Sequence, residues 1–353
     1  MCVKKISLLA ASTIRIFILI ILFTNNSKAE ENNIKYYSND MGILSLMYHR
    51  FDEKKYPSTN IQMDIFKQQI KIIKDLNYNF YNPADLEKNF YIKKKEKKIL
   101  ITIDDAFASF YDAAWPYLKK EKIPFILFVS TETVGNNGYM TWKQIKKLEK
   151  EPNVHIGNHS HSHKYLVNFK KKDFINDINK ANTIFIEKLG YNPIFFSYPF
   201  GEYSEFIQKH ITKNFKFSFG QHSGVIDINK NPYELPRFPI NEKYGDLKRF
   251  EFLINLYPLE FKKLSPNEKY LTNDNNPPKF SVEFFKDQNN LDNINCFSDE
   301  GNKWEKSNVF LNKNILKIKF REKFIFRRGR VNCSLNDNGI WRWFGIQFSI
   351  QQN

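Results

Sequence analysis

The sequence has 353 residues, which is enough for one large domain with an addition or for two domains. Its formal net charge is +16, but the lysines are spread along the chain and lack the interleaved aromatic residues of a nucleic-acid groove. The composition therefore argues against a nucleic-acid partner, and we attribute the charge mostly to a solvated surface.

The N-terminus has the pattern of a signal peptide, residues 1–29. A lysine pair begins it, residues 16–23 form an apolar run, and Ser27 and Ala29 place small residues before the expected cleavage site. The run is short for a membrane span, although an uncleaved N-terminal anchor is an alternative. In either case we expect an exported protein that is periplasmic, associated with the cell envelope or secreted.

From residue 40 to about residue 245, apolar runs alternate with segments of helical spacing, which predicts β-α units around a parallel sheet. The expected strands are 43–48, 99–103, 125–129, 154–156, 195–198 and 215–219. Helical spacing occurs in residues 66–73, 107–118 and 174–185. Such sheets carry their working groups at the carboxyl ends of the strands, and the polar clusters of this chain follow the expected strands.

The rest of the chain has a different pattern. We expect a helix from Asp246 to about Tyr270, and a helix and linker over residues 246–278 that end in a segment rich in Asn and Pro. Residues 279–353 are expected to form a small antiparallel β domain. Its expected strands are 280–285, 309–320, 323–327 and 340–350. Cys296 and Cys333 are predicted to form a disulfide between two of its strands, with two free thiols as the alternative.

Two adjacent carboxylates, Asp104 and Asp105, end the apolar run 99–103. They could be a solvated strand end and a helix cap, but like charges this close also indicate a bound cation or a shared proton. His159 and His163 are four residues apart and can reach one ion, although surface histidine clusters are common. Two histidines and one carboxylate are the donor set of a catalytic zinc site, and the second carboxylate could take a proton from metal-bound water. The pattern predicts metal-assisted hydrolysis of an ester or amide.

Three ordered motifs resemble the signature motifs of the NodB-type polysaccharide deacetylases. They are Thr102-Ile103-Asp104-Asp105-Ala106, His159-Ser160-His161-Ser162-His163 and Ser197-Tyr198-Pro199-Phe200-Gly201. The resemblance covers residues 40–245 and implies a distorted (β/α) barrel that removes N- or O-linked acetyl groups from a glycan. By position, it implies that Asp104 is the general base and that Asp105, His159 and His163 are the metal ligands. Zinc is the default ion for these ligands, and cobalt, nickel and iron also accept them.

The third motif implies that Tyr198 and Phe200 wall the sugar groove, and that the Phe200 N–H helps to hold the developing oxyanion. The alternative is a simple strand exit at Pro199. The chain departs from the family in three ways. Ala106 replaces the usual glycine, which is a mild change if φ is negative there. Ser197 stands where many members have an arginine that steadies the base, and the usual Leu-x-His motif of the general acid is missing.

His49 is one candidate for the general acid. It lies in a segment, Leu46-Met47-Tyr48-His49-Arg50, that resembles the start of the exported poly-N-acetylglucosamine deacetylases, whose motif order is circularly permuted. His222 is the rival acid, and a packed strand-end histidine is the alternative for His49. Arg237 is a candidate to pair with Asp104 in place of the missing arginine, unless it is an ordinary surface residue. The expected substrate-binding residues are Tyr198, Phe200, Arg237 and His222.

The leading hypothesis is therefore an exported, metal-dependent deacetylase of an acetylated glycan. The alternative is a non-catalytic, exported carbohydrate-binding protein on a degenerate deacetylase scaffold. The missing arginine and acid favour this alternative, whereas the intact set of two aspartates and two histidines disfavours it. The sequence determines neither the glycan nor the oligomeric state.

Overall fold

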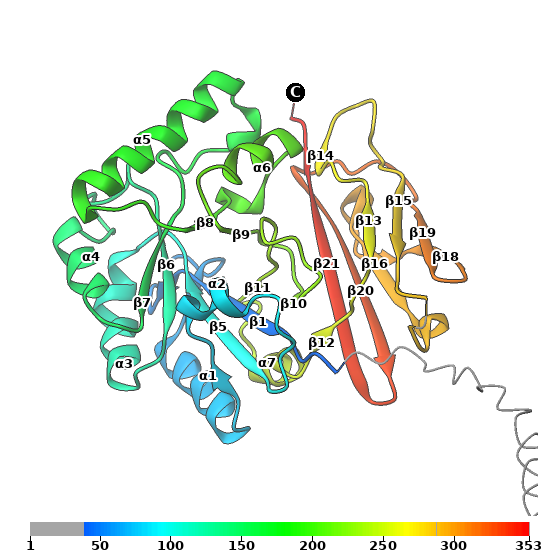
Figure 1. Cartoon of the computed structure of the whole chain (residues 1–353), viewed down its shortest axis with the longest axis horizontal. Coiled ribbons are helices and arrows are strands. Elements are labelled where there is room, and N and C mark those ends of the chain that lie inside the picture. Colours follow the sequence, from blue (N-terminus) through cyan, green and yellow to red (C-terminus); the bar gives the residue numbers. More distant parts are fainter. Residues whose placement is uncertain (1–38, 287, 353) are drawn as a thin grey trace, which may run out of the picture. The chain divides into compact units, whose positions relative to one another are not determined.

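The computed structural model describes residues 39–286 and 288–352, which form an α/β half followed by a β half (Figure 1). The expected signal peptide lies outside these residues. Within them, no helix has the length and apolar character that a membrane span requires.

A nine-stranded sheet forms the core of the α/β half, and its central strands run parallel in the order β1, β5, β6, β7, β8, β9 (Figure 1). These strands are Ile43–Tyr48, Lys98–Ile103, Phe125–Val129, Val154–Asn158, Phe195–Ser197 and Phe217–Phe219. Three short strands flank them, namely β4 (Asn79–Phe80), β10 (Val225–Ile226) and β11 (Phe238–Pro239), and β2 (Arg50–Phe51) pairs separately with β3 (Asn60–Ile61). The predicted parallel sheet is confirmed.

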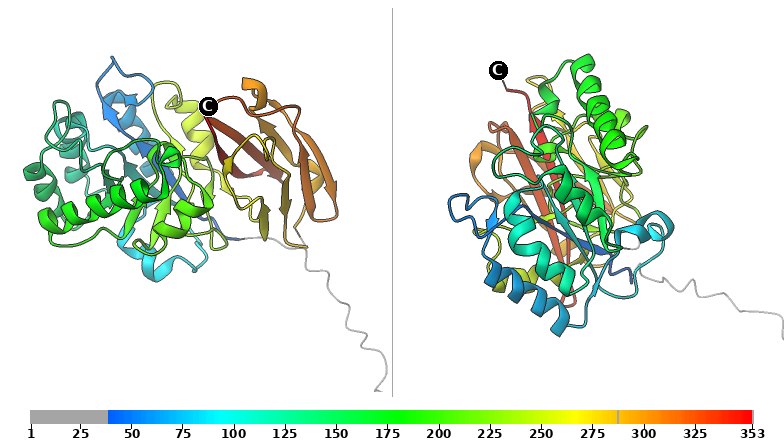
Figure 2. Two further views of the ribbon diagram at one scale, coloured as in Figure 1. Left: turned by 90° about the horizontal axis from the view of Figure 1, so that it is seen from above. Right: turned by 90° about the vertical axis from the view of Figure 1, so that its left-hand side faces the viewer.

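Helices cover the outer face of this sheet (Figure 2). They are α1 (Met63–Asp75), α2 (Leu86–Asn89), α3 (Trp115–Lys120), α4 (Trp142–Glu149), α5 (Lys171–Leu189), α6 (Glu205–Ile211) and α7 (Leu247–Ile254). Local sequence explains several of their ends. Thr141 and Gln144 form a capping box before α4, and Gly190 ends α5 at a φ of 87°, where a side chain would be strained.

The strands have two apolar faces. Along β5 and β6, Ile101 and Leu127 pack in the cluster that includes the helices, whereas Leu100, Ile126 and Phe128 pack in a second cluster inside the curled sheet. Because side chains alternate along a strand, Thr102 and Asp104 share the inner face with Leu100. The sequence of β5 therefore aims Asp104 into the barrel.

A single extended segment closes the barrel between β9 and β1. Residues 232–235 exchange backbone hydrogen bonds with Ser218 and Gly220 on one side, and β11 pairs in parallel with β1 on the other. The distorted (β/α) barrel that the family resemblance implies is confirmed, and the closing segment, residues 232–240, carries Arg237.

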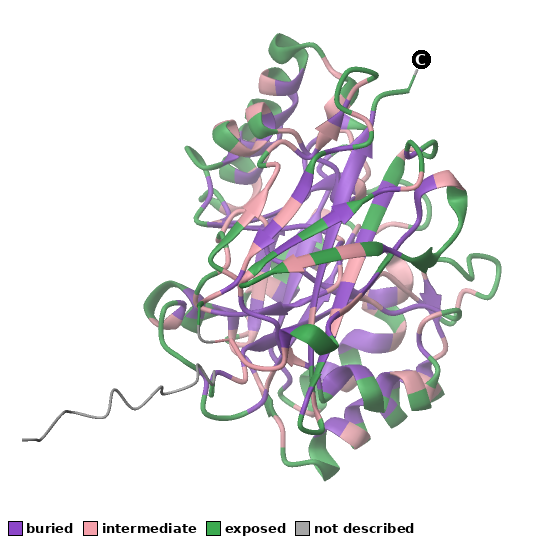
Figure 3. Cartoon of the chain, turned by 90° about the vertical axis from the view of Figure 1, so that its right-hand side faces the viewer, coloured by how far each residue is buried: buried purple, intermediate pink, exposed green. Residues whose placement is uncertain are grey.

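The C-terminal half consists of two mainly antiparallel sheets with an apolar cluster between them. The first contains β12 (Tyr257–Pro258), β14 (Tyr270–Leu271), β16 (Asn295–Ser298), β17 (Glu305–Lys306), β20 (Arg328–Asp337) and β21 (Ile340–Ile350), of which β12 and β14 join β21 in parallel. The second contains β13 (Lys263–Ser265), β15 (Phe280–Glu283), β18 (Asn308–Asn312) and β19 (Ile315–Lys319). Buried and exposed residues alternate along β19 and β20, and Figure 3 shows buried and exposed segments next to one another on this side of the molecule. The predicted disulfide is confirmed, since Cys296 and Cys333 are bonded across β16 and β20.

Three expected elements of this region are different in the structure. The helix from Asp246 ends at Ile254, because Pro258 lacks a helical N–H and residues 257–258 pair with β21 instead. The strand expected at 309–320 is a hairpin that turns at Lys313, where φ is 55°. Residues 323–327 are not a strand, since the neighbours Ile325 and Phe326 are both exposed, which contradicts an alternating pattern.

The two halves are in contact beside the carboxyl ends of β8 and β9. Trp343 Nε1 donates a hydrogen bond to Ser223 Oγ at 3.2 Å, and Gln347 Nε2 donates to the Phe200 carbonyl at 3.0 Å. Gly224 and Phe344 form an isolated antiparallel bridge. The long β20–β21 hairpin thus reaches the loops that follow the parallel strands.

Candidate active site

The side chains that the sequence predicts to act in catalysis or metal binding converge at one edge of the barrel. His49 follows β1, Asp104 and Asp105 follow β5, and His159 and His163 lie in the loop after β7. Because the strands are parallel, their carboxyl ends lie at the same edge of the sheet. Residues distant in the sequence are brought together there.

One set of side chains could hold a metal ion and is called the metal group below: Asp105, His159 and His163. Asp105 Oδ1 is 3.1 Å from His163 Nε2 and 3.5 Å from His159 Nε2. In the described part of the chain, one donor atom from each residue lies within 4.8 Å of the other two. Two ligands of one tetrahedral zinc ion are about 3.4 Å apart, so the spacing fits a single ion.

The tautomer of His159 is set by the backbone. Its ring is fully buried, and Nδ1 donates to the Ser197 carbonyl at 2.7 Å. Nε2 is left with a lone pair and has no hydrogen-bond partner among the described residues. Burial lowers the pKa of His159 to about 4, although Asp104 opposes this shift. A neutral imidazole with a free, buried Nε2 is the form that ligates metal ions.

A strained loop carries the two histidines. Ser160 and His163 have φ values of 68° and 50°, a region that costs a residue with a side chain about 1–3 kcal/mol. Asn158 Oδ1 accepts from the Ser160 N–H at 2.7 Å, and Ser160 Oγ accepts from the His163 N–H at 3.0 Å. These bonds hold the loop in the shape that aims both rings at Asp105.

Sequence reasoning missed two residues of α5 that support this loop. The Asp177 carboxylate accepts from the N–H groups of His161 and Ser162 at 2.9 and 3.1 Å. Asn182 Oδ1 accepts from Asn158 Nδ2 at 3.0 Å. Both are nearly buried polar residues on the apolar face of the helix, and that break in the helical pattern was the available signal.

Asp104 is held by Arg237 in a buried, two-bonded ion pair. Arg237 Nη1 donates to Oδ1 at 2.6 Å and Nη2 donates to Oδ2 at 2.8 Å, and both side chains are fully buried. Burial by itself raises the Asp104 pKa, but Arg237 and then His159 outweigh burial and hold the pKa below its usual range. Asp104 is therefore ionised at neutral pH, and its proposed pairing with Arg237 is confirmed.

Ser197 gives Arg237 the room to reach Asp104. Arg237 Nη2 donates to Ser197 Oγ at 2.8 Å, Nη1 donates to Thr102 Oγ1 at 3.2 Å, and Nε donates to the Gly220 carbonyl at 2.9 Å. The guanidinium thus comes from the closing segment of the barrel instead of from position 197. Because Arg237 is fully buried, its place is behind Asp104 and not on a substrate surface.

The two candidate acids lie in different surroundings. His49 is partly buried at the end of β1, and it is close enough to Asp104 to lower that residue's pKa further. His222 is buried, and burial together with Lys230 and Lys269 lowers its pKa to about 3. His222 is therefore unprotonated near neutral pH, which disfavours it as a proton donor.

Of the two aromatic residues expected in the groove wall, Phe200 is beside the metal group. Its ring centroid is 4.8 Å from that of His163 and 4.2 Å from that of Tyr165, on which it stacks. Tyr198 is fully buried, stacks on Tyr203 and donates its hydroxyl to the Tyr233 carbonyl at 3.0 Å. The structure places Tyr198 behind the wall, not on it, because Pro199 turns the chain between the two rings.

The backbone at the aspartate pair is strained. Asp105 and Ala106 have φ values of 73° and 53°, so the condition under which alanine would be a mild replacement for glycine is not met. The left-handed conformation costs Ala106 about 1–2 kcal/mol. The Ala106 carbonyl accepts from the Met140 N–H at 2.9 Å, which helps to hold the turn.

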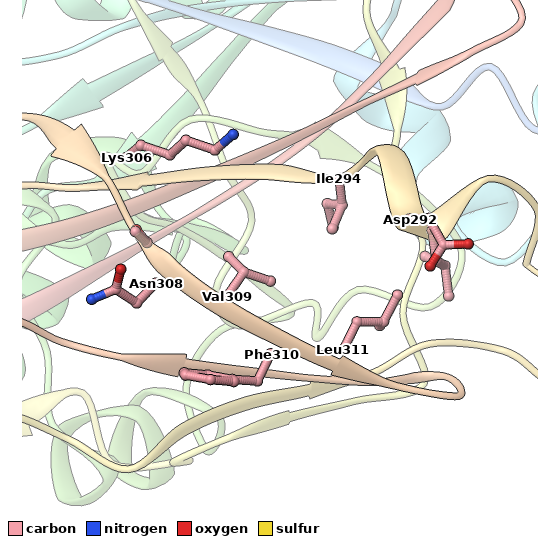
Figure 4. Close-up of a pocket in the computed structure, with 9 residues that line it drawn as sticks. Asp292, Ile294, Lys306, Asn308, Val309, Phe310 and Leu311 are labelled. Atoms are coloured by element: carbon pink, nitrogen blue, oxygen red, sulfur yellow. The ribbon is translucent and has the colours of Figure 1, made fainter.

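A cavity of about 650 Å³ lies elsewhere, in the C-terminal half (Figure 4). Its labelled lining includes Ile294, Val309 and Leu311, with the Asp292 carboxylate and the Lys306 ammonium at its ends. None of the residues expected to act in catalysis lines it, so this cavity is separate from the candidate active site at the carboxyl ends of the parallel strands.

Comparison with known families identifies the α/β half. Residues 91–217 match the profile of the family described as Polysaccharide deacetylase. The chain contains a polysaccharide deacetylase domain. This confirms the resemblance seen in the three motifs and the prediction of a deacetylase enzyme, and the profile spans both the aspartate pair and the histidine motif of the deacetylase.

Curated and solved relatives agree. The deacetylase is 26% identical over 241 residues to the poly-beta-1,6-N-acetyl-D-glucosamine N-deacetylase of Staphylococcus aureus, which covers 59% of this chain and 81% of that protein. IcaB from Ammonifex degensii superposes with a TM-score of 0.56 at 25% identity, over 61% of this chain and 97% of that one. The Streptococcus pyogenes deacetylase PplD, solved with acetate, shares the fold with a TM-score of 0.55 at 22% identity, over 61% and 99% of the two chains.

Proposed function

We propose that this deacetylase is an exported, divalent-metal-dependent enzyme that hydrolyses the N-acetyl groups of a poly-N-acetylglucosamine-type glycan. The observation that carries the proposal is that Asp104 lies close to Asp105, His159 and His163 at the carboxyl ends of the parallel strands. The name of the Staphylococcus aureus relative supports β-1,6-linked N-acetylglucosamine as the substrate.

Asp105, His159 and His163 would hold the ion, and the free, buried Nε2 of His159 supports this assignment. One carboxylate and two imidazoles suit zinc first, and cobalt, nickel or iron next. A bound divalent ion supplies a Lewis acid and lowers the pKa of a coordinated water. A donor set of three residues would suit a catalytic ion, which needs room for water and substrate.

The remaining residues divide the proton transfers. Asp104, ionised and oriented by Arg237, takes a proton from the water whose oxygen attacks the acetyl carbonyl carbon. The carbon–nitrogen bond then breaks, and His49 gives a proton to the leaving amine. The products are acetate and an unsubstituted glucosamine unit. Phe200, whose ring lies beside that of His163, is assigned to hold the developing oxyanion with its backbone N–H.

The carbohydrate-binding alternative has lost one of its two supports. It rested partly on the missing family arginine, and Arg237 occupies the place beside Asp104 that this arginine would take. A guanidinium that orients a buried carboxylate with two hydrogen bonds serves a proton acceptor more directly than a sugar-binding surface.

The test is acetate release from an N-acetylated β-1,6-linked glucosamine pentamer, with the β-1,4-linked pentamer for comparison. Purified protein is stripped with a chelator and then reloaded separately with zinc, cobalt or nickel. Asp104→Asn and His49→Ala probe the two proton transfers, and His163→Ala probes the ion. Asp112→Asn, an exposed aspartate on the helical segment after the pair, is the matched control.

We expect metal-restored release from the β-1,6 pentamer that falls at least 100-fold in Asp104→Asn and is unchanged in Asp112→Asn. His163→Ala should also lower the bound metal measured by mass spectrometry, a result that does not depend on turnover. Stoichiometric metal and tight pentamer binding without any acetate release would instead support the binding-protein alternative.

A further inference from the structure

A stack of side chains runs from the metal group to the C-terminal half. The Phe200 ring lies 4.8 Å from His163, and Tyr165 stacks on Phe200 with centroids 4.2 Å apart and planes 26° apart. On Tyr165 lies Arg327, with its guanidinium carbon 3.7 Å from the ring centroid. Tyr165 and Arg327 are far apart in the sequence and come from different halves of the chain.

Contacts between the two halves fix both ends of this stack. Gln347 Nε2 donates to the Phe200 carbonyl at 3.0 Å. The Glu202 carboxylate, which is 1% exposed, lies 3.6 Å from Arg327 Nη1 and 3.9 Å from Arg328 Nε. Two contacts therefore set the position of Arg327: its ion pair with Glu202 and its packing on the face of the Tyr165 ring.

The stack is partly exposed next to the metal group, although Phe200 and Arg327 cover the two faces of the Tyr165 ring. Tyr165 is 37% exposed, and the side chain of Arg327 is 23% exposed. The exposed parts are therefore the edge of Tyr165 and part of the Arg327 side chain, and a planar guanidinium, apolar on its flat side and rich in donors at its edge, suits a sugar ring. The charge that this group exposes is positive, because its carboxylate is buried while Arg328 is 43% exposed.

We propose that Phe200, Tyr165 and Arg327 form a subsite for the sugar unit next to the one being deacetylated, and that it selects an uncharged, still acetylated unit. This inference rests on the proposed function. A sugar unit that has already lost its acetyl group carries an ammonium, and the guanidinium groups of Arg327 and Arg328 repel this positive charge. The deacetylase would therefore act within acetylated stretches of the glycan and avoid units beside free amines.

The experiment compares substrates that do and do not extend over the stack. An aryl acetate ester occupies the metal group alone, whereas the acetylated β-1,6 pentamer also covers its surroundings. Arg327→Ala should lower kcat/KM for the pentamer about 10-fold, mainly by raising KM. The kcat/KM for the aryl acetate should change by less than twofold. Arg327→Lys, which keeps the charge but not the plane, should recover only part of the loss. Arg321→Ala is the control, because Arg321 has the same 23% side-chain exposure and pairs with Glu300 instead.

A second arm tests the selection for uncharged units. We expect the parent to act at least 10-fold more slowly on a pentamer with one free amine beside the target unit, and Arg327→Ala to reduce this difference. Tyr165→Leu should lower kcat/KM for the pentamer in the same way. This second variant provides an independent test in case the arginine variant misfolds. An equal loss for the ester and the pentamer, or no loss for either, would overturn the proposal.

Failure of the proposed function can be recognised separately. If the parent releases no acetate from any pentamer, the affinity of the acetylated pentamer for the metal-loaded parent is measured by calorimetry. The subsite requires weaker binding in Arg327→Ala than in Arg321→Ala even then. Equal affinities in the two variants would exclude it.

Discussion

At the scale of single residues, the main feature is the buried ion pair of Asp104 and Arg237, whose arginine comes from a different position than in many family members. Ser197 occupies the position where many family members have an arginine, and Arg237 delivers the guanidinium from another strand. The geometry at Asp104 is kept because a guanidinium needs only to arrive with its two N–H groups facing the carboxylate. A small side chain at 197 and a long one at 237 are therefore complementary.

This complementarity can be tested by exchanging the two residues. Arg237→Ser should lower kcat for the pentamer about 100-fold, because it removes the partner that orients Asp104, the proposed base, and leaves this carboxylate buried without a cation. The double variant Ser197→Arg, Arg237→Ser should recover at least 10-fold, since it restores the arrangement typical of the family. Kinetics and thermal melting of the two single variants and the double variant form the cycle. A double variant no better than Arg237→Ser would contradict the exchange.

At the scale of elements, the disulfide joins β16 to the long β20–β21 hairpin within a 37-residue loop. In the chain-entropy account, this cross-link stabilises the fold by about 4 kcal/mol because it restricts the unfolded chain. Cys296→Ser combined with Cys333→Ser should lower the free energy of unfolding by this amount. Denaturant titration measures it, and the reducing agent should affect the parent but not the double variant. An unchanged midpoint in the reduced parent would contradict the prediction.

The sequence predicts the elements whose signal is local. The parallel strands appear as apolar runs, and the rule that such sheets act at their carboxyl ends locates Asp104, Asp105, His159 and His163. The direction of Tyr198 and the positive φ of Ala106 depend on how the following turns pack, so local pattern does not reveal them. Residues 323–327 have the composition of a strand, but Asn276 binds the backbone of Phe324 and holds this segment as an irregular connection.

At the scale of the whole molecule, Glu202 links pH to the contact between the halves. Burial raises the pKa of Glu202 from its usual 4.5 to about 7, against the effect of Arg327 and Arg328. The folded chain thus binds more protons than the unfolded chain between these values, and this group's contribution to stability falls as pH rises through the window.

Glu202→Gln should remove that dependence, because its amide stays uncharged. Relative to the parent, the free energy of unfolding of this variant should rise by roughly 3 kcal/mol between pH 4.5 and pH 8. Glu87→Gln, at an exposed carboxylate paired with Lys216, is the control and should run parallel to the parent. Denaturant titrations at several pH values provide the measurement, and a difference that is constant with pH would contradict the role of Glu202.

The closing segment of the barrel also has a consequence for biosynthesis. Asp104 and Arg237 are separated by 133 residues. At a translation rate of about 5–20 residues per second, the ribosome adds the arginine roughly 7 to 27 s after the aspartate. During that interval the nascent chain has its aspartates, and later its histidines, but it lacks Arg237 and strand β11, which pairs with β1. The Asp104–Arg237 pair therefore cannot form until the segment that closes the barrel has been synthesised.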